Sequence, residues 1–129
     1  ITTLDRVLAE SDILSLHLPA TDETYHLICE DSINKMKDGV LIVNTARGSI
    51  VDEKAAAEAL KNGKIGGLGT DVFESEPVDL QNPLFGFDNY IAGPHIAAET
   101  YDNCEETSVM TAESVLRVFR GEAPHNPIV

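Results

Sequence analysis

Four short apolar runs alternate with helix-like segments, and this alternation constrains the fold more than any other feature of the chain. The runs lie near residues 13–17, 40–44, 66–72 and 90–92. None shows the strict apolar/polar alternation that is typical of a strand with one solvated face. Strands that are covered on both faces and joined by helices form a parallel sheet. The pattern therefore predicts an α/β fold with a doubly wound parallel sheet.

The segments between the apolar runs carry the usual signals of helix ends. Thr2 and Thr3 are possible caps, Asp52 is a natural N-cap, and glycines follow several of the segments. The stretch 76–89 contains two prolines and is predicted to be a loop, and the tail 122–129 is predicted to be extended. The predicted helices are one that includes Leu4, Val7 and Leu8, a short one around 33–37 closed by Gly39, one over 53–61 followed by Gly63, and a long one from about 99 to 120.

One part of a complete dinucleotide-binding domain is not visible in these residues. Such a domain opens with a strand, a glycine-rich turn and a helix, and the turn binds the pyrophosphate of the cofactor. Gly66, Gly67 and Gly69 lie inside a predicted strand and begin no helix. We therefore expect residues 1–98 to form the second half of a Rossmann-type domain.

Composition excludes several functional classes. The chain of 129 residues carries 9 Lys and Arg against 22 Asp and Glu, so its net charge of −13 would repel nucleic acid. No apolar stretch is long enough to span a membrane, and no segment is typical of a signal peptide. Cys29 and Cys104 lack the spacing of metal ligands, which favours reduced thiols. We expect a cytoplasmic protein with no nucleic-acid partner, no membrane partner and no metal site.

Polar residues follow each predicted strand. They are the segments 17–19 and 44–48, the single residue Asp71, and the pair Pro94–His95. Because the carboxyl ends of parallel strands line the ligand crevice of an open α/β sheet, these four strand ends converge on one predicted site.

Arg47 and His95 have both a functional and a structural interpretation. The guanidinium of Arg47 is suited to binding a substrate carboxylate at two points, and Gly48 would let the backbone turn sharply after it. The structural alternative pairs Arg47 with Asp52 at a helix start. His95 is suited to proton exchange near neutral pH, although a single histidine is often only a hydrogen-bonded structural group.

The segment 71–77 places three carboxylates, Asp71, Glu74 and Glu76, within six residues. One of them is expected to orient His95. Glu74 is predicted to be solvated. His26 and His125 are also predicted to be surface groups, since their neighbours are polar residues or prolines.

Four segments, taken in order, carry a family resemblance. They are His17-Leu18-Pro19 followed by Thr24, the stretch from Met36-Lys37-Asp38-Gly39 to Asn44-Thr45-Ala46-Arg47-Gly48, Asp71-Val72-Phe73-Glu74-Ser75-Glu76-Pro77, and Pro94-His95-Ile96-Ala97. In order and spacing these segments resemble the D-isomer-specific 2-hydroxyacid dehydrogenases. The resemblance covers nearly the whole chain.

The resemblance implies a two-domain oxidoreductase that uses NAD(H), acts on a small 2-oxo or 2-hydroxy acid and forms a homodimer. Residues 99–129 would be a long crossover helix and tail returning toward a substrate domain absent from this chain. The implied catalytic residues are Arg47, Glu76 and His95. The implied cofactor-binding residues are His17, Pro19, Thr45, Ala46, Arg47, Asp71, His95 and Ala97, with Asp71 near the nicotinamide.

Other interpretations stay open because the sequence departs from the family's motifs in places and because other classes of protein share the fold. Many family members have a glycine soon after the Pro-His pair, where this chain has Ala97-Ala98-Glu99-Thr100. The glycine-rich turn and the acidic ribose-binding residue are not found here, so NADP stays open beside NAD. Formate dehydrogenases resemble this chain with glutamine in place of Glu76. Transcriptional corepressors that share the fold and sense NAD(H), or a structural segment without activity of its own, are the alternatives from other classes.

Overall fold

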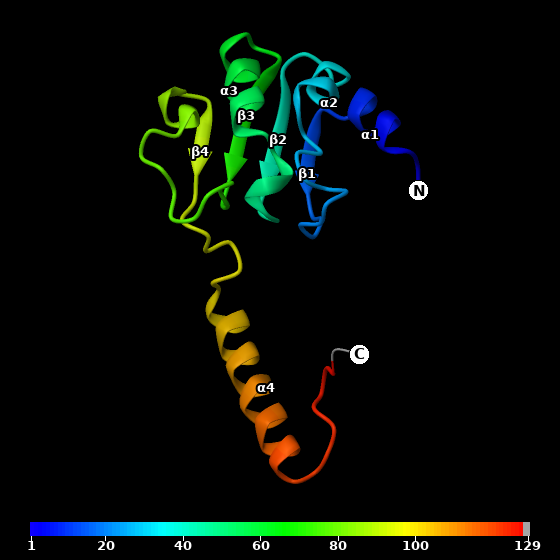
Figure 1. The fold of residues 1–129 in the computed structure, drawn as a ribbon, viewed down its shortest axis with the longest axis vertical. Helices are drawn as coiled ribbons and strands as arrows, with labels where there is room; N and C mark the ends of the chain where they lie inside the picture. Colours follow the sequence, from blue (N-terminus) through cyan, green and yellow to red (C-terminus); the bar gives the residue numbers. More distant parts are fainter. Residues whose placement is uncertain (128–129) are drawn as a thin grey trace. The chain divides into compact units, whose positions relative to one another are not determined.

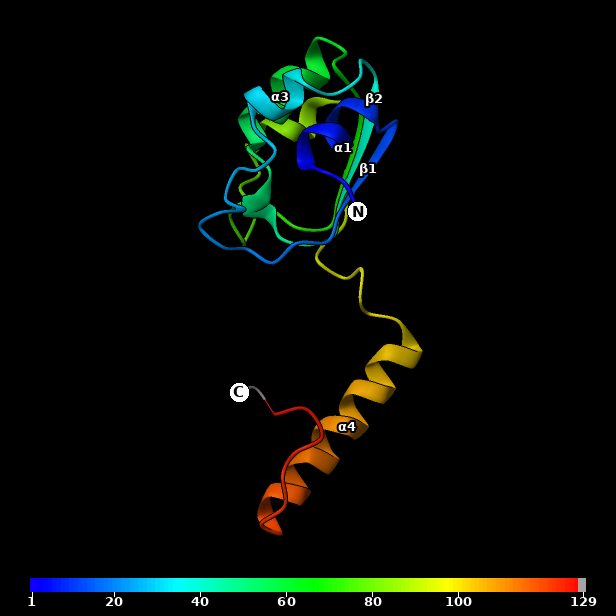
Figure 2. The same cartoon turned by 90° about the vertical axis from the view of Figure 1, so that its right-hand side faces the viewer.

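The computed structural model describes residues 1–127, and these divide into two compact units (Figures 1 and 2). The first unit is Ile1–His95, and the second begins at Ile96. Each unit is described by itself below.

The first unit is built on a four-stranded parallel sheet. Neighbouring strands pair in the order β1-β2-β3-β4, so each strand lies beside the next one in the chain. This confirms the predicted parallel α/β fold. The strands are β1 (Ile13–Leu16), β2 (Val40–Asn44), β3 (Ile65–Thr70) and β4 (Tyr90–Ala92).

Helix α1 (Leu4–Glu10) precedes β1, whereas α2 (Glu30–Asn34) connects β1 to β2 and α3 (Glu53–Lys61) connects β2 to β3. Figure 2 shows α1 and α3 on the same side of the sheet. Helix α3 has the predicted bounds because the Asp52 carboxylate accepts hydrogen bonds from Lys54 N and Ala55 N. Short 3₁₀ turns lie at Gly48–Ile50 and Pro83–Gly86.

Helix α2 lies earlier than predicted. The sequence placed it around residues 33–37, but it begins at Glu30 because Cys29 N donates to the Ser32 hydroxyl at 2.8 Å and closes the first turn. The chain leaves the helix after Asn34, and Gly39 enters β2 with φ +78°. Gly39 therefore lies in the turn directly before β2 and does not close the helix.

The expectation that both faces of the sheet are covered is wrong for the described residues. Burial alternates along the strands: one face packs against the helices, while the other leaves apolar side chains exposed. The strands lack an apolar/polar alternation because the open face is apolar as well. The buried face carries Leu14, Leu16, Val40, Ile42, Ile65 and Leu68, and the open face carries Ile13, Leu41, Val43 and Ile91.

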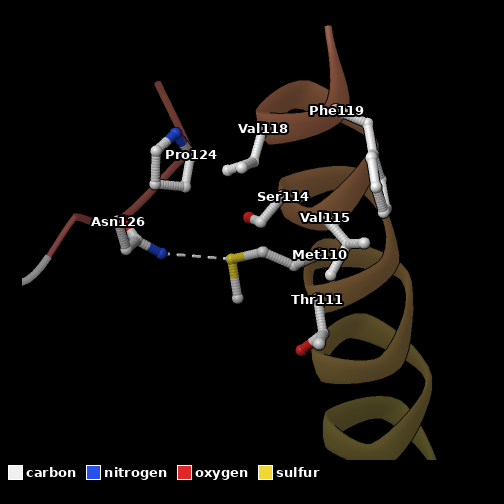
Figure 3. Close-up of a pocket in the computed structure, with 8 residues that line it drawn as sticks. All are labelled: Met110, Thr111, Ser114, Val115, Val118, Phe119, Pro124 and Asn126. Atoms are coloured by element: carbon white, nitrogen blue, oxygen red, sulfur yellow. Dashed lines mark hydrogen bonds between the residues drawn. The ribbon is translucent and has the colours of Figure 1, made fainter. Parts of the chain in front are cut away.

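The second unit contains helix α4 (Tyr101–Phe119) and a tail. The Thr100 hydroxyl accepts from Asn103 N at 3.2 Å, which starts α4 two residues after the predicted Glu99. The tail was predicted to be extended, but it folds back onto α4. His125 Nε2 lies 3.3 Å from Glu113 Oε2, and Asn126 Nδ2 donates a hydrogen bond to Met110 Sδ (Figure 3). His125 is exposed, as predicted for a surface group, and the structure adds its ion-pair contact with Glu113. The last two residues of the predicted segment 99–129 lie outside the described residues.

Side chains of α4 and the tail line an apolar hollow of about 520 Å³ (Figure 3). The helix buries none of its residues, and even Leu116 and Phe119 of its predicted apolar face are exposed. Across residues 1–127, no helix combines the length and the apolar character needed to cross a membrane.

Candidate active site

The turn after β2 is built by the buried side chain of Asn44. Its Nδ2 donates to Arg47 O at 3.0 Å, and its Oδ1 accepts from Ala46 N at 3.1 Å. The two hydrogen bonds fix the backbone of Ala46 and Arg47 against the Asn44 side chain, and Thr45 and Arg47 remain exposed. Because Asn44 ends β2, the turn projects from the carboxyl edge of the sheet.

Gly48 allows two loops to touch. A Cβ at this position would overlap the backbone of Phe73 and Glu74. Gly48 has no positive φ, so its role is close approach and not the sharp turn that the sequence suggested. The segment 71–77 therefore lies directly against the turn that carries Arg47.

His95 and Glu76 form the predicted hydrogen-bonded pair. His95 Nδ1 lies 2.8 Å from Glu76 Oε2, and the two residues follow β4 and β3 respectively. An ionised carboxylate only accepts, so the hydrogen of this bond lies on Nδ1. The two side chains remain 49% and 40% exposed, which leaves the imidazole within reach of a ligand.

The environment of Glu76 favours its ionised form. The hydrogen bond from His95 lowers the pKa of the Glu76 carboxyl most, followed by the bond from Phe73 N, and the charge of Arg47 contributes as well. Arg47 therefore acts on the same carboxylate that holds His95. The three residues expected to be catalytic gather at one edge of the sheet.

A hollow of about 520 Å³ lies between the ends of β1 and β2. His17, Pro19, Ala46 and Arg47, all expected to bind the cofactor, line it. The Ser15 hydroxyl lies 2.8 Å from His17 Nε2 and orients that imidazole. The volume falls within the range of small-molecule sites, and the hollow has the expected position for a nucleotide in an open α/β sheet.

Asp71 is buried directly after β3, where Asp71 N donates to Asn44 O at 2.9 Å. A Cβ on Gly93 would overlap Asp71 Oδ1, so the glycine after β4 makes room for this carboxylate. Ala97 belongs to the second unit, and its role toward the cofactor stays a prediction.

Glu74 is exposed, as predicted, but its carboxylate pairs with His26, which is only partly exposed and so not the fully solvated group that was expected. His26 Nε2 lies 2.8 Å from Glu74 Oε1, and the two side chains are only 26% and 34% exposed. The Asp52 carboxylate caps α3, and its Oδ2 lies 3.9 Å from His26 Nδ1. These contacts differ from the Arg47–Asp52 pair that was the structural alternative for Arg47. The His26–Glu74 contact joins residues 48 positions apart, and no local motif signals it.

A family model described as "D-isomer specific 2-hydroxyacid dehydrogenase, NAD binding domain" matches residues 1–97. A glyoxylate reductase of Korarchaeum cryptofilum is 44% identical over 123 residues, which are 95% of this chain and 37% of the relative. A D-3-phosphoglycerate dehydrogenase of Archaeoglobus fulgidus is 43% identical over 96% of this chain and 24% of its own length. The chain thus spans well under half the length of these curated relatives.

Among solved structures, a D-lactate dehydrogenase of Aquifex aeolicus in complex with NAD and lactic acid matches with a TM-score of 0.87 and 40% identity. That match covers 94% of this chain and 41% of the other. A protein of Thermus thermophilus, TT0316, matches with a TM-score of 0.94 and 38% identity over 99% of this chain and 41% of its own. The fold, the strand-end motifs and the family model agree, and the chain belongs to the D-isomer-specific 2-hydroxyacid dehydrogenase family, with residues 1–97 in its NAD-binding domain.

Proposed function

We propose that this chain is part of a longer, two-domain oxidoreductase that interconverts a small D-2-hydroxy acid and the matching 2-oxo acid with NAD(H). The observation that carries the proposal is the His95–Glu76 bond of 2.8 Å beside the Arg47 turn. The relatives named glyoxylate reductase and hydroxypyruvate reductase support this substrate class.

The chemistry divides among the three side chains. In the reductive direction, the guanidinium of Arg47 binds the substrate carboxylate at two points and polarises the neighbouring carbonyl. His95, whose Nδ1–H is engaged by Glu76, delivers a proton to the carbonyl oxygen from Nε2. Glu76 keeps the imidazole oriented through this hydrogen bond. Bound NADH supplies the hydride that the protein's own side chains lack.

The residues at the carboxyl edge of the sheet fit a nucleotide. His17, Pro19 and Ala46 line the hollow beside Arg47, and Thr45 is exposed on the same turn. We assign these residues to the cofactor. Asp71 and Ala97 are assigned to it as well, by resemblance to the family.

The proposal also covers the domain organisation of the chain, its cellular environment and its association with a second copy. We assign residues 1–98 to the second half of the dinucleotide-binding domain and residues 99–129 to a crossover helix and tail. Free Cys29 and Cys104 support a reducing, cytoplasmic environment. The exposed apolar side chains of α4 support association with a second copy, which light scattering of the full-length protein tests.

The decisive experiment offers the full-length protein NADH with glyoxylate, hydroxypyruvate and pyruvate, and follows the loss of NADH absorbance. The expected result is turnover of at least one of them, with the D-hydroxy acid as product where the product is chiral. NADH binding without turnover of any 2-oxo acid would instead favour the corepressor class and overturn the proposal.

A further inference from the structure

We propose that His26 and Glu74 are positioning residues that fix the segment 71–77 and, through it, the Glu76 carboxylate that orients His95. This inference rests on the proposed dehydrogenase function. Both residues lie outside the set expected to touch substrate or cofactor, and their contact is a second histidine–carboxylate pair beside the first.

His26 is itself held in a fixed orientation. Its backbone adopts φ +49°, and its N–H donates to Ser49 O at 2.8 Å. The ring stacks on Tyr25 with centroids 4.0 Å apart, and its Nδ1 faces Asp52 Oδ2 at 3.9 Å. These contacts leave Nε2 directed at Glu74. A nonglycine residue in the left-handed region is uncommon and indicates that the surrounding contacts determine the conformation.

Glu74 is bound from more than one side. Its Oε1 accepts from His26 Nε2 at 2.8 Å and from the Tyr25 hydroxyl at 3.3 Å. Its backbone N–H donates to Glu53 Oε1 at 2.9 Å, at the first residue of α3. Gly48 admits the same backbone against the Arg47 turn. Glu74 is therefore contacted by three segments, which are the turn at Tyr25 and His26, the start of α3 and the turn after β2.

The link from Glu74 to Glu76 is short. Only Ser75 separates them, and Glu76 Oε1 accepts from Phe73 N at 3.1 Å on the other side of Glu74. A displacement of Glu74 therefore moves both the Glu76 backbone and the donor that holds its carboxylate. A shift of roughly 1 Å in a catalytic constellation can reduce the rate by about 10²-fold, whereas a partly exposed ion pair adds little to stability.

The test compares His26→Ala and Glu74→Ala in the full-length protein with two further variants. His26→Gln restores an N–H donor toward Glu74, and Lys35→Met removes an exposed ion pair with Asp5 on a different surface. We expect His26→Ala and Glu74→Ala to lower kcat by about tenfold or more, with the Kd for NADH nearly unchanged. His26→Gln is expected to recover most of this loss, and Lys35→Met to equal the wild type.

A second measurement separates positioning from a loss of folded protein. The solvent deuterium isotope effect on kcat should rise in His26→Ala, because poorer proton delivery becomes more limiting, and a smaller folded fraction would leave it unchanged. In a Glu76→Gln background, His26→Ala should lower kcat much less than in the wild type. An equal loss in both backgrounds, or a wild-type kcat in His26→Ala and Glu74→Ala, overturns the inference. If Glu76→Gln and His95→Gln themselves leave kcat unchanged, it is the proposed function that fails.

Discussion

At the scale of residues, the candidate catalytic side chains come from segments that follow β2, β3 and β4 at the carboxyl edge of the sheet. Arg47, Glu76 and His95 stand at strand ends, where parallel topology makes side chains converge, and the structure joins the last two directly. The contact between His26 and Glu74 was not predicted, because it depends on how loops far apart in the sequence pack together. Glu53 was predicted only as the first residue of a helix, yet its carboxylate also holds Glu74 N and Asn82 Nδ2.

The guanidinium of Arg47 gives the first prediction at this scale. In the full-length protein, Arg47→Lys keeps the charge but loses two-point binding of a carboxylate, so KM for the 2-oxo acid should rise and kcat fall. The Kd for NADH, measured by fluorescence titration, should change much less. Steady-state kinetics that match the wild type would remove Arg47 from the substrate site.

Glu76 gives a prediction about acid stability. Its pKa in the folded protein is lowered, chiefly by the bond from His95, so the unfolded state binds the proton more readily. The contribution to stability is present above the unfolded pKa of roughly 4.3 and is lost as the pH falls through the lower folded pKa.

Glu76→Gln lacks this contribution at every pH. The difference in free energy of unfolding between wild type and variant should therefore be largest near pH 6 and shrink toward pH 3, and it should not exceed about 1 kcal/mol for a pair this exposed. Urea unfolding at the two pH values measures it. A difference that grows on acidification contradicts the assignment.

At the scale of elements, the start of a helix was predicted correctly where a single strong N-cap residue marked it. Asp52 placed α3 at its observed bounds, whereas the Ser32–Cys29 bond started α2 earlier than the apolar pattern indicated. Within residues 1–127 the helices cover only one face of the sheet, and hydropathy did not reveal this because the other face is equally apolar. The role of Gly48 was also misjudged, since a close approach between loops has no local signature.

Gly48 supplies the prediction for this scale. Gly48→Ala places a methyl group into the backbone of Phe73 and Glu74, so the two loops must separate. Overpacking of this kind costs about 1–3 kcal/mol, and kcat should fall with it because Arg47 and Glu76 move apart. Gly69→Ala is the matched control, since its Cβ would meet no atom within 4 Å. Equal melting temperatures and activities for the two variants would disprove the close approach.

At the scale of the molecule, the described residues form one edge of a site. They hold the candidate catalytic groups and a hollow at the ends of β1 and β2, but no glycine-rich turn between a strand and a helix occurs in the sequence. The family resemblance indicated that these residues carry only part of the site, because a resemblance compares whole motifs in order. The composition and periodicity of the chain indicated only the parallel sheet.

The isolated 129-residue chain is therefore expected to bind NADH weakly and to reduce no 2-oxo acid. A nucleotide's pyrophosphate is bound by backbone N–H groups at a helix N-terminus that follows such a turn. Fluorescence titration with NADH, run beside the full-length protein, measures the difference. Equal affinity for the two polypeptides would contradict this division of the site.

The most direct test of the central claim is the single-turnover rate of NADH oxidation by the full-length protein and its His95→Gln variant, at saturating 2-oxo acid. If His95, oriented by Glu76, delivers the proton to the carbonyl oxygen, the variant should be slower by about 10² to 10⁴-fold while its Kd for NADH stays close to that of the wild type. A variant that oxidises NADH within about twofold of the wild-type rate would show that the proton comes from elsewhere, because loss of a general acid cannot leave the rate intact.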